Sequence, residues 1–215
     1  MTTLPRPRPS PTVLEGRYTR LEPLTLSHAA GLYKASCEAQ RFDYLPDPPP
    51  ASVAEVQAWI ERTLKNSEYL FSAVVDRATG EAAGRQALMR IEPAHGVIEI
   101  GNILWGPAIS RTRISTEAFF LAARHVFDEL GYRRFEWKCN DRNEPSKAAA
   151  LRFGFTFEGL FRQHMVIKGE NRDTAWFSII DREWPEIRKA FERWLDPANF
   201  DSAGRQNAKL AASRT

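Results

Sequence analysis

The chain has few of the features that mark secreted, metal-binding or membrane proteins. Its 215 residues include only two cysteines, Cys37 and Cys139, too few for a disulfide framework and without the spacing of a metal site. No segment approaches the roughly 18 consecutive apolar residues of a membrane helix. Prolines rather than an apolar segment follow Arg6 and Arg8, so a signal peptide is not indicated. We therefore expect a cytoplasmic protein with no metal and no membrane partner.

A strong excess of charge is also absent. The chain has 30 Lys and Arg against 27 Asp and Glu, a formal net charge of +3, and the basic residues are spread without a dense run. Nucleic-acid binding is therefore not favoured. A small cationic excess suits a phosphate-bearing small molecule, but it also suits an ordinary solvated surface, which we favour.

The composition along the chain predicts one domain with two tails. Four prolines between residues 3 and 11 favour an extended, polyproline-like N-terminal arm over residues 1–11. Residues 12–197 have the length of a single domain. The small, polar residues that dominate 198–215 predict a flexible C-terminal tail.

Hydrophobic periodicity and turn residues predict alternating helices and strands within this domain. The segment between residues 97 and 139 predicts strand, turn, helix and strand, so its two strands should be parallel. In chain order, we expect strands at residues 18–24, 70–76, 82–92, 97–105, 135–139, 155–163 and 165–178, and helices at residues 27–38, 53–64, 116–130, 143–153 and 181–195.

Two segments carry the chemical information. In the first, Asn143 can cap a helix with its side-chain oxygen, Pro145 suits the first turn, and Gly154 ends the apolar run. In the second, residues 99–118, an apolar strand runs through a short polar turn into a helix. Free N–H groups at such a helix start can bind a phosphate, and Arg111 and Arg113 add two cations. The second segment thus predicts an anion site.

Together these segments resemble the GNAT acetyltransferase superfamily and, within it, the RimJ/RimL-like branch, over residues 12–185. Asn143-x-x-Ser146 followed by Gly154-Phe155-x-Phe157-Glu158-Gly159 is similar to a family signature, and residues 168–174 resemble the turn of its last hairpin. The resemblance implies an α/β (α+β) fold: a mixed, mostly antiparallel seven-stranded sheet, splayed between strands 4 and 5, with helices on both faces. The residues around Phe42 and Tyr44 would form one wall of the acceptor site.

The phosphate turn departs from the family's Gln/Arg-x-x-Gly-x-Gly/Ala pattern. Ser110 stands at the Gln/Arg position, Arg113 at the first Gly and Ser115 at the Gly/Ala. A side chain at Arg113 restricts how closely the backbone can approach a phosphate, although Arg can itself bind one.

The resemblance implies direct transfer of an acetyl group from acetyl-coenzyme A to a primary amine, either the α-amine of a protein N-terminus or a small-molecule amine. Glu99 is the first candidate for the base and His164 the second, while Ser146 would donate a proton or a hydrogen bond to the leaving thiolate. The cofactor-binding residues implied are Leu104, Trp105, Arg111, Thr112, Arg113, Ile114, Ser115, Thr116, Asn143 and Ser146.

Other interpretations stay open at this level. Glu99 can instead pair with an Arg, and His164 can be a structural or surface residue. A non-catalytic domain that binds acyl-coenzyme A, or a protein-interaction domain, is the alternative function, and a homodimer is left open.

Overall fold

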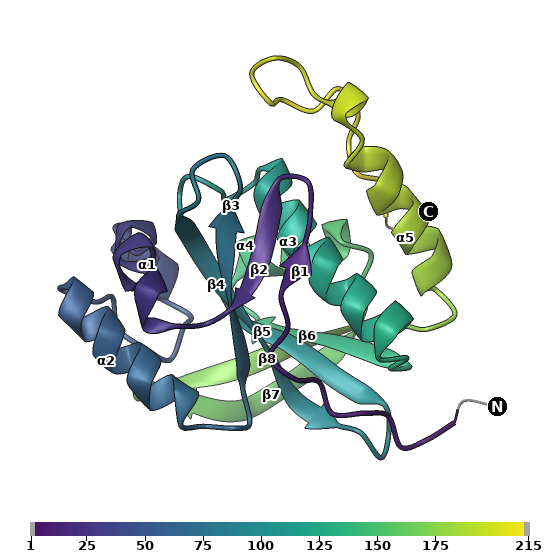
Figure 1. Ribbon diagram of the computed structural model, residues 1–215. Helices are drawn as coiled ribbons and strands as arrows, with labels where there is room; N and C mark the ends of the chain where they lie inside the picture. Colours follow the sequence, from purple (N-terminus) through teal and green to yellow (C-terminus); the bar gives the residue numbers. More distant parts are fainter. Residues whose placement is uncertain (1–2, 213–215) are drawn as a thin grey trace.

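Eight strands form one mixed sheet in the order β1-β2-β3-β4-β5-β6-β8-β7 (Figure 1). The computed structural model describes residues 3–212. The strands are β1 Leu14–Glu15, β2 Thr19–Pro23, β3 Leu70–Asp76, β4 Ala82–Glu92, β5 Val97–Trp105, β6 Arg134–Asn140, β7 Thr156–Ile167 and β8 Glu170–Ile180. The helices are α1 Ala29–Ala35, α2 Val53–Leu64, α3 Arg113–Arg124, α4 Glu144–Arg152 and α5 Trp184–Trp194, with shorter helical segments η1 Leu26–His28, η2 Ala39–Phe42, η3 His125–Glu129 and η4 Pro197–Asn199.

The predicted fold class is confirmed, and the predicted strand count is wrong by one. Only β5 and β6 pair in parallel, and every other pair of neighbouring strands is antiparallel. The extra strand is β1, whose two residues pair with Arg20 and Leu21 of β2. Two residues are too few to show the alternation by which a strand is recognised in a sequence.

The sheet splays between β5 and β6. These strands pair only at Val97–Ile100 with Arg134–Trp137. Beyond Ile100, β5 remains paired with β4, and Asn102 at φ 50° marks an irregularity in that pairing. The backbone groups of β5 that face β6 beyond this point are therefore free for another partner. Because β5 and β6 are the fourth and fifth of the strands expected from the sequence, the predicted position of the splay is confirmed.

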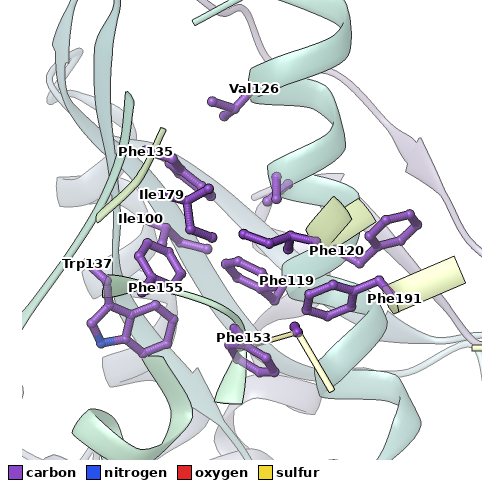
Figure 2. Close-up of a cluster of buried hydrophobic side chains, with 14 of the residues drawn as sticks. Ile100, Phe119, Phe120, Val126, Phe135, Trp137, Phe153, Phe155, Ile179 and Phe191 are labelled. Atoms are coloured by element: carbon purple, nitrogen blue, oxygen red, sulfur yellow. The ribbon is translucent and has the colours of Figure 1, made fainter. Parts of the chain in front are cut away.

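Helices cover both faces of the sheet. On one face, α3, α4 and α5 enclose an aromatic core in which Phe119 stacks on Phe153 at 4.5 Å between ring centroids (Figure 2). On the other face, α1 and α2 pack on β2 to β4, with Val56 and Ile60 against Ala73 and Val75. This second core does not extend to β6, β7 or β8. In those strands many residues on the same face are charged, polar or aromatic, among them Lys138, Thr174 and Trp176.

Several predicted boundaries shift for local reasons. Thr112 caps α3 by accepting the Ile114 N–H, so the helix begins at Arg113 rather than at residue 116. The first helix follows a capping box formed by Thr25 and His28, not a cap at Ser27. The predicted limits of α2, β3, β4 and β5 agree with the structure.

The final hairpin was predicted with strands meeting near residue 164, and this is wrong. Its turn lies at Lys168–Gly169, as the family likeness over residues 168–174 indicated. A bulge between Phe161 and Met165, with Gln163 at φ 51°, interrupts the alternation inside β7. A bulge resembles a strand boundary in a sequence because it shifts the side-chain alternation.

Both ends of the described chain lie against the domain. In the expected arm, the Arg6 N–H donates to the Pro93 carbonyl and the Tyr132 hydroxyl donates to the Pro7 carbonyl. In the expected tail, most residues from 202 to 209 are exposed, whereas Leu210 and Ala212 are buried against the domain. Within residues 3–212, no helix is long and apolar enough to cross a membrane.

A buried carboxylate joins α3 to the start of β2. Glu117 accepts the N–H groups of Arg17, Tyr18 and Thr19 at 2.6–2.8 Å. A Cβ at Gly16 would lie 2.6 Å from this carboxylate, so only glycine fits there. Glu117 therefore has a structural role, which is to hold the N-terminal strands against α3.

We expect Glu117→Gln to lower the free energy of unfolding by about 3 kcal/mol, because an amide cannot accept three N–H donors and leaves at least one buried and unpaired. Urea unfolding monitored by fluorescence measures the change. Glu61→Gln, the same substitution at an exposed position of α2, is the control and should shift the midpoint little. Equal midpoints for the two variants would show that the Glu117 bonds do not hold the strands.

Candidate active site

A polar turn connects β5 to α3 and presents backbone N–H groups. Ser110 and Thr112 close the turn by donating to the carbonyls of Gly106 and Ile109, and Arg111 has φ 61°. The N–H groups of Arg111, Arg113 and Ser115 find no acceptor among residues 3–212. Because they stand at the positive end of the α3 dipole, they form the kind of site that binds a phosphate group.

Arg113 does not obstruct this turn. It is the first residue of α3, so its backbone is helical and needs no glycine. Its guanidinium lies over the Tyr18 ring, 4.4 Å from the centroid, and near Phe200. The side chain is thus committed to a packing contact with β2 and the C-terminal segment. Of the two arginines predicted to bind phosphate, only Arg111 is exposed.

A cation that the sequence analysis missed stands beside the same helix start. Arg152 of α4 donates to Thr116 Oγ1 at 3.1 Å and lies over the rings of Phe153 and Trp194. No carboxylate pairs with it among the described residues, and burial lowers the pKa of its guanidinium. Its position depends on how α4 packs near α3, which no local sequence signal reports.

Asn143 and Ser146 begin α4 next to the splay. Asn143 Oδ1 accepts the Ser146 N–H at 3.1 Å, so the predicted cap is confirmed. The Ser146 Oγ accepts the Trp137 Nε1–H at 3.0 Å, and the Cys139 thiol is also within hydrogen-bonding reach. Trp137 is the last residue of β6 that pairs with β5. Ser146 therefore lies where the two strands separate, with its hydroxyl proton available for donation.

The β5 backbone presents Trp105 rather than Leu104 to the opening. The Gly106 N–H donates to Ala83 of β4, and N–H groups alternate in direction along a strand. The N–H of Trp105 therefore points away from β4, toward the splay, while that of Leu104 points toward β4. The Trp105 carbonyl, on the same side, accepts from Arg41 at 3.1 Å.

Charged side chains cover the free face of β4 to β8 beside the opening, and Glu99 is at their centre. This buried carboxylate uses Oε2 to contact Arg90 Nη1 at 2.8 Å and Lys138 Nζ at 3.0 Å. Lys138 also contacts Glu136 and lies 3.7 Å from the Trp176 ring centroid. The expectation that Glu99 pairs with an arginine is confirmed. Both cations thus contact Oε2 rather than Oε1.

His164 lies on the same face, at the β7 bulge. Its Nδ1 is 3.0 Å from Thr174 Oγ1, which also accepts from Arg172 Nε. Burial lowers the pKa of the imidazole, and the nearby cations Arg172, Arg90 and Lys138 lower it further. The neutral ring is therefore favoured at neutral pH, and the two predicted bases share one electrostatic environment.

The loop between α1 and α2 reaches across the end of the sheet. The Tyr44 hydroxyl donates to the Arg142 carbonyl, and Lys168 Nζ donates to the Phe42 carbonyl. With Arg41 on the Trp105 carbonyl, these bonds tie the loop to both sides of the splay. The loop predicted to form a wall of the acceptor site thus spans the opening between β5 and β6.

Comparison with known proteins agrees with this geometry. Residues 19–156 match the model of the "Acetyltransferase (GNAT) domain". The crystal structure of a GCN5-related N-acetyltransferase from Brucella melitensis is 56% identical, has a TM-score of 0.94, and aligns over 97% of this chain and 96% of its own.

Two Bacillus proteins are more distant relatives. The first, "Uncharacterized N-acetyltransferase p20" of Bacillus licheniformis, is 29% identical over 60% of this chain and 71% of its own length. The second, "Putative ribosomal N-acetyltransferase YdaF" of Bacillus subtilis, is 28% identical over 49% of this chain and 57% of its own. The match of residues 19–156 to the family model and the 56% identical crystal structure agree with the splayed sheet and the phosphate turn. The chain therefore belongs to the GNAT acetyltransferase family, as a member similar to its RimJ/RimL-like branch.

Proposed function

We propose that the chain transfers an acetyl group directly from acetyl-coenzyme A to a primary amine bound on the free face of β5 to β8. The observation that carries this proposal is the position of Glu99 and His164 on that face, beside the opening between β5 and β6. A donor in the opening and an amine on the face would meet without a covalent enzyme intermediate.

Acetyl-coenzyme A, the donor, supplies an activated acetyl thioester. Different groups of the chain are placed to bind its pyrophosphate, its extended arm and its thioester carbonyl. The free N–H groups of the phosphate turn, together with Arg111 and Arg152, suit its pyrophosphate. The free edges of β5 and β6 suit its amide-containing arm, which would pair with them as an added strand. The N–H of Trp105 is directed to polarise the thioester carbonyl.

In this proposal, His164 removes the proton of the amine. If Nδ1 donates to Thr174, then Nε2 keeps a free lone pair, and the lowered pKa of the ring keeps it unprotonated at pH 7. Glu99 Oε1 accepts a hydrogen bond from the amine and holds it near the opening. As the C–S bond breaks, the thiolate sulfur of the donor accepts a hydrogen bond from the Ser146 hydroxyl, whose oxygen is already held by Trp137.

For the acceptor, the name of the Bacillus subtilis relative supports the α-amine of a ribosomal protein, and a small-molecule amine is the other class we retain. Arg113 in the phosphate turn gave some weight to the non-catalytic alternative, and its side chain lies over Tyr18 instead. We therefore place the transferase first.

Ser146→Ala should lower kcat by about 100-fold, because the leaving sulfur loses a hydrogen-bond donor, while the Kd for coenzyme A should change less than threefold. Glu99→Gln should behave similarly with amine acceptors. Turnover measured with N-terminal peptides and small amines, and titration calorimetry with coenzyme A, separate the two effects. Binding of coenzyme A without transfer to any amine would favour the non-catalytic domain.

Arg152→Gln should weaken coenzyme A binding at least tenfold, because it removes a cation from the phosphate turn. Arg113→Gln is the matched control, and its Kd should stay within threefold of wild type because its side chain packs on Tyr18. Calorimetric titration of both variants measures the difference. The opposite order of effects would mean that Arg113 leaves Tyr18 to bind the phosphates.

The pH dependence of kcat/KM should identify the base. A lowered His164 pKa means that activity is retained at neutral pH and lost only as the pH falls below 6.5, the ordinary value for histidine. Arg172→Gln removes a neighbouring cation, so the acid limb should move to higher pH. Arg162→Gln, an exposed neighbour, should leave the limb in place. If His164→Gln leaves the acid limb of the kcat/KM profile unchanged, another group accepts the proton of the amine. Glu99 would then be the next residue to test.

A further inference from the structure

A second concave site lies on the same face of the sheet, beneath the loop that joins α1 to α2. Its volume is about 160 Å³. The loop forms an apolar wall, and Trp59 of α2 forms a planar one. The sheet contributes the charged Arg85 from β4 and the apolar Leu104 from β5. The residues that carry the inference are Phe42, Pro48, Pro50, Trp59, Arg85 and Leu104.

Arg85 is a buried and incompletely paired cation in this pocket. Its side chain is 4% exposed, and its Nη1 has no hydrogen-bond partner within residues 3–212. Its Nη2 is 3.5 Å from Asp47 Oδ2, at the outer limit of a hydrogen bond, and that oxygen also accepts the Trp59 Nε1–H at 3.1 Å. Burial lowers the pKa of the guanidinium to about 10, with Asp47 opposing the shift, so the group is charged at neutral pH.

An unpaired buried N–H group such as Arg85 Nη1–H destabilises the protein when no ligand is bound. A buried donor without an acceptor loses its hydration and gains nothing in return. The Trp59 ring, 4.0 Å from the guanidinium carbon, holds Arg85 in a fixed orientation without satisfying its N–H groups. Arg85 is thus positioned to bind an acceptor group that the described chain does not supply.

The pocket lies on the same face of the sheet as the proposed acceptor site. Arg85 is opposite Leu104 and Met89 is opposite Glu99 in the β4–β5 register, and side chains four residues apart on a strand share a face. Arg85 and Glu99 therefore lie on one face of the sheet. Leu104, which borders the pocket, immediately precedes the Trp105 N–H at the splay.

We propose that this pocket binds a carboxylate of the acceptor, which is then an amine that also carries a carboxylate on a compact apolar skeleton. The inference rests on the proposed transferase function and specifies its substrate class. A carboxylate matches the planar guanidinium geometrically, and cavities of about 150 Å³ hold a benzene-sized group. An amino-carboxylate small molecule and an acidic side chain near a peptide N-terminus both present this chemistry.

Asp47 occupies the place of the ligand carboxylate in the free protein. It belongs to the loop, its side chain is about one-third exposed, and it is the carboxylate that contacts Arg85. An incoming carboxylate would displace it toward solvent. The other carboxylate at the pocket, Glu55, is already held by the Ala51 N–H, and the exposed Arg62 adds a second cation.

The test compares matched acceptors that differ only in charge. The probes are para-aminomethylbenzoate against para-aminomethylbenzamide, and the C-terminally amidated peptides Asp-Ala-Ala against Asn-Ala-Ala. Each is titrated into the full-length protein saturated with coenzyme A, and kcat/KM is then measured with acetyl-coenzyme A. We expect the carboxylate member of at least one pair to bind at least tenfold more tightly than its amide. The pair that shows the preference identifies the source of the carboxylate.

Variants assign the preference to the pocket. Arg85→Gln should abolish it, and Asp47→Asn should increase carboxylate affinity severalfold by removing the competing negative charge. Arg133→Gln, an exposed arginine at the other end of β5 and β6, should leave it unchanged. If Arg85→Gln does not fold, as judged by thermal unfolding, then Asp47→Asn carries the test alone.

The outcomes separate this inference from the proposed function. Equal binding of acid and amide probes, or binding of neither, overturns the carboxylate pocket even if other amines are acetylated. A preference that survives in Arg85→Gln, or an unchanged affinity in Asp47→Asn, also overturns it. Absence of coenzyme A binding or of transfer to any amine overturns the transferase itself.

Discussion

The functional architecture depends on a parallel pairing that ends early. Four residues of β5 are paired with four of β6, and the strands then separate. This short pairing joins strands β1 to β5 and strands β6 to β8 into one sheet, which packs on an aromatic core on the α3 face. The separation releases backbone donors and acceptors in the middle of the molecule, where an unpaired strand edge would otherwise be a liability. A polar, extended ligand is the natural partner for such an opening.

The groups around the opening come from elements that only tertiary packing brings together. Ser146 is positioned by a cap at the start of α4, and His164 by a bulge in β7. Glu99 is held by cations from β4 and β6. Each side chain is fixed by a partner outside its own element. Precise placement of this kind is expected where the fold, rather than a flexible loop, sets the geometry of a site.

The sequence predicts local structure well where turn residues and alternation agree. The limits of α2, β3, β4 and β5 follow from caps and turns read directly from the chain, and the family signature identified Asn143 and Ser146 together. The β7 bulge was read as a strand end because both interrupt alternation. Arg152, Lys138 and Arg85 were not anticipated, because the importance of each comes from burial and from partners distant in the sequence. An arginine in a helix or strand has no local mark that distinguishes a solvated side chain from a buried one.

The ion pairs on the free face form one continuous series from β4 to β7. Lys138 links Glu99 to Glu136, and Arg134 links Glu136 to Glu158, which also accepts from Ser178. Each internal member of the series serves two partners, so no pair in it is energetically independent. A change of charge on this face would thus require a compensating change, because replacing one charge removes a counterion from its neighbour. Natural variants that exchange a charge here should therefore carry a second exchange one strand away.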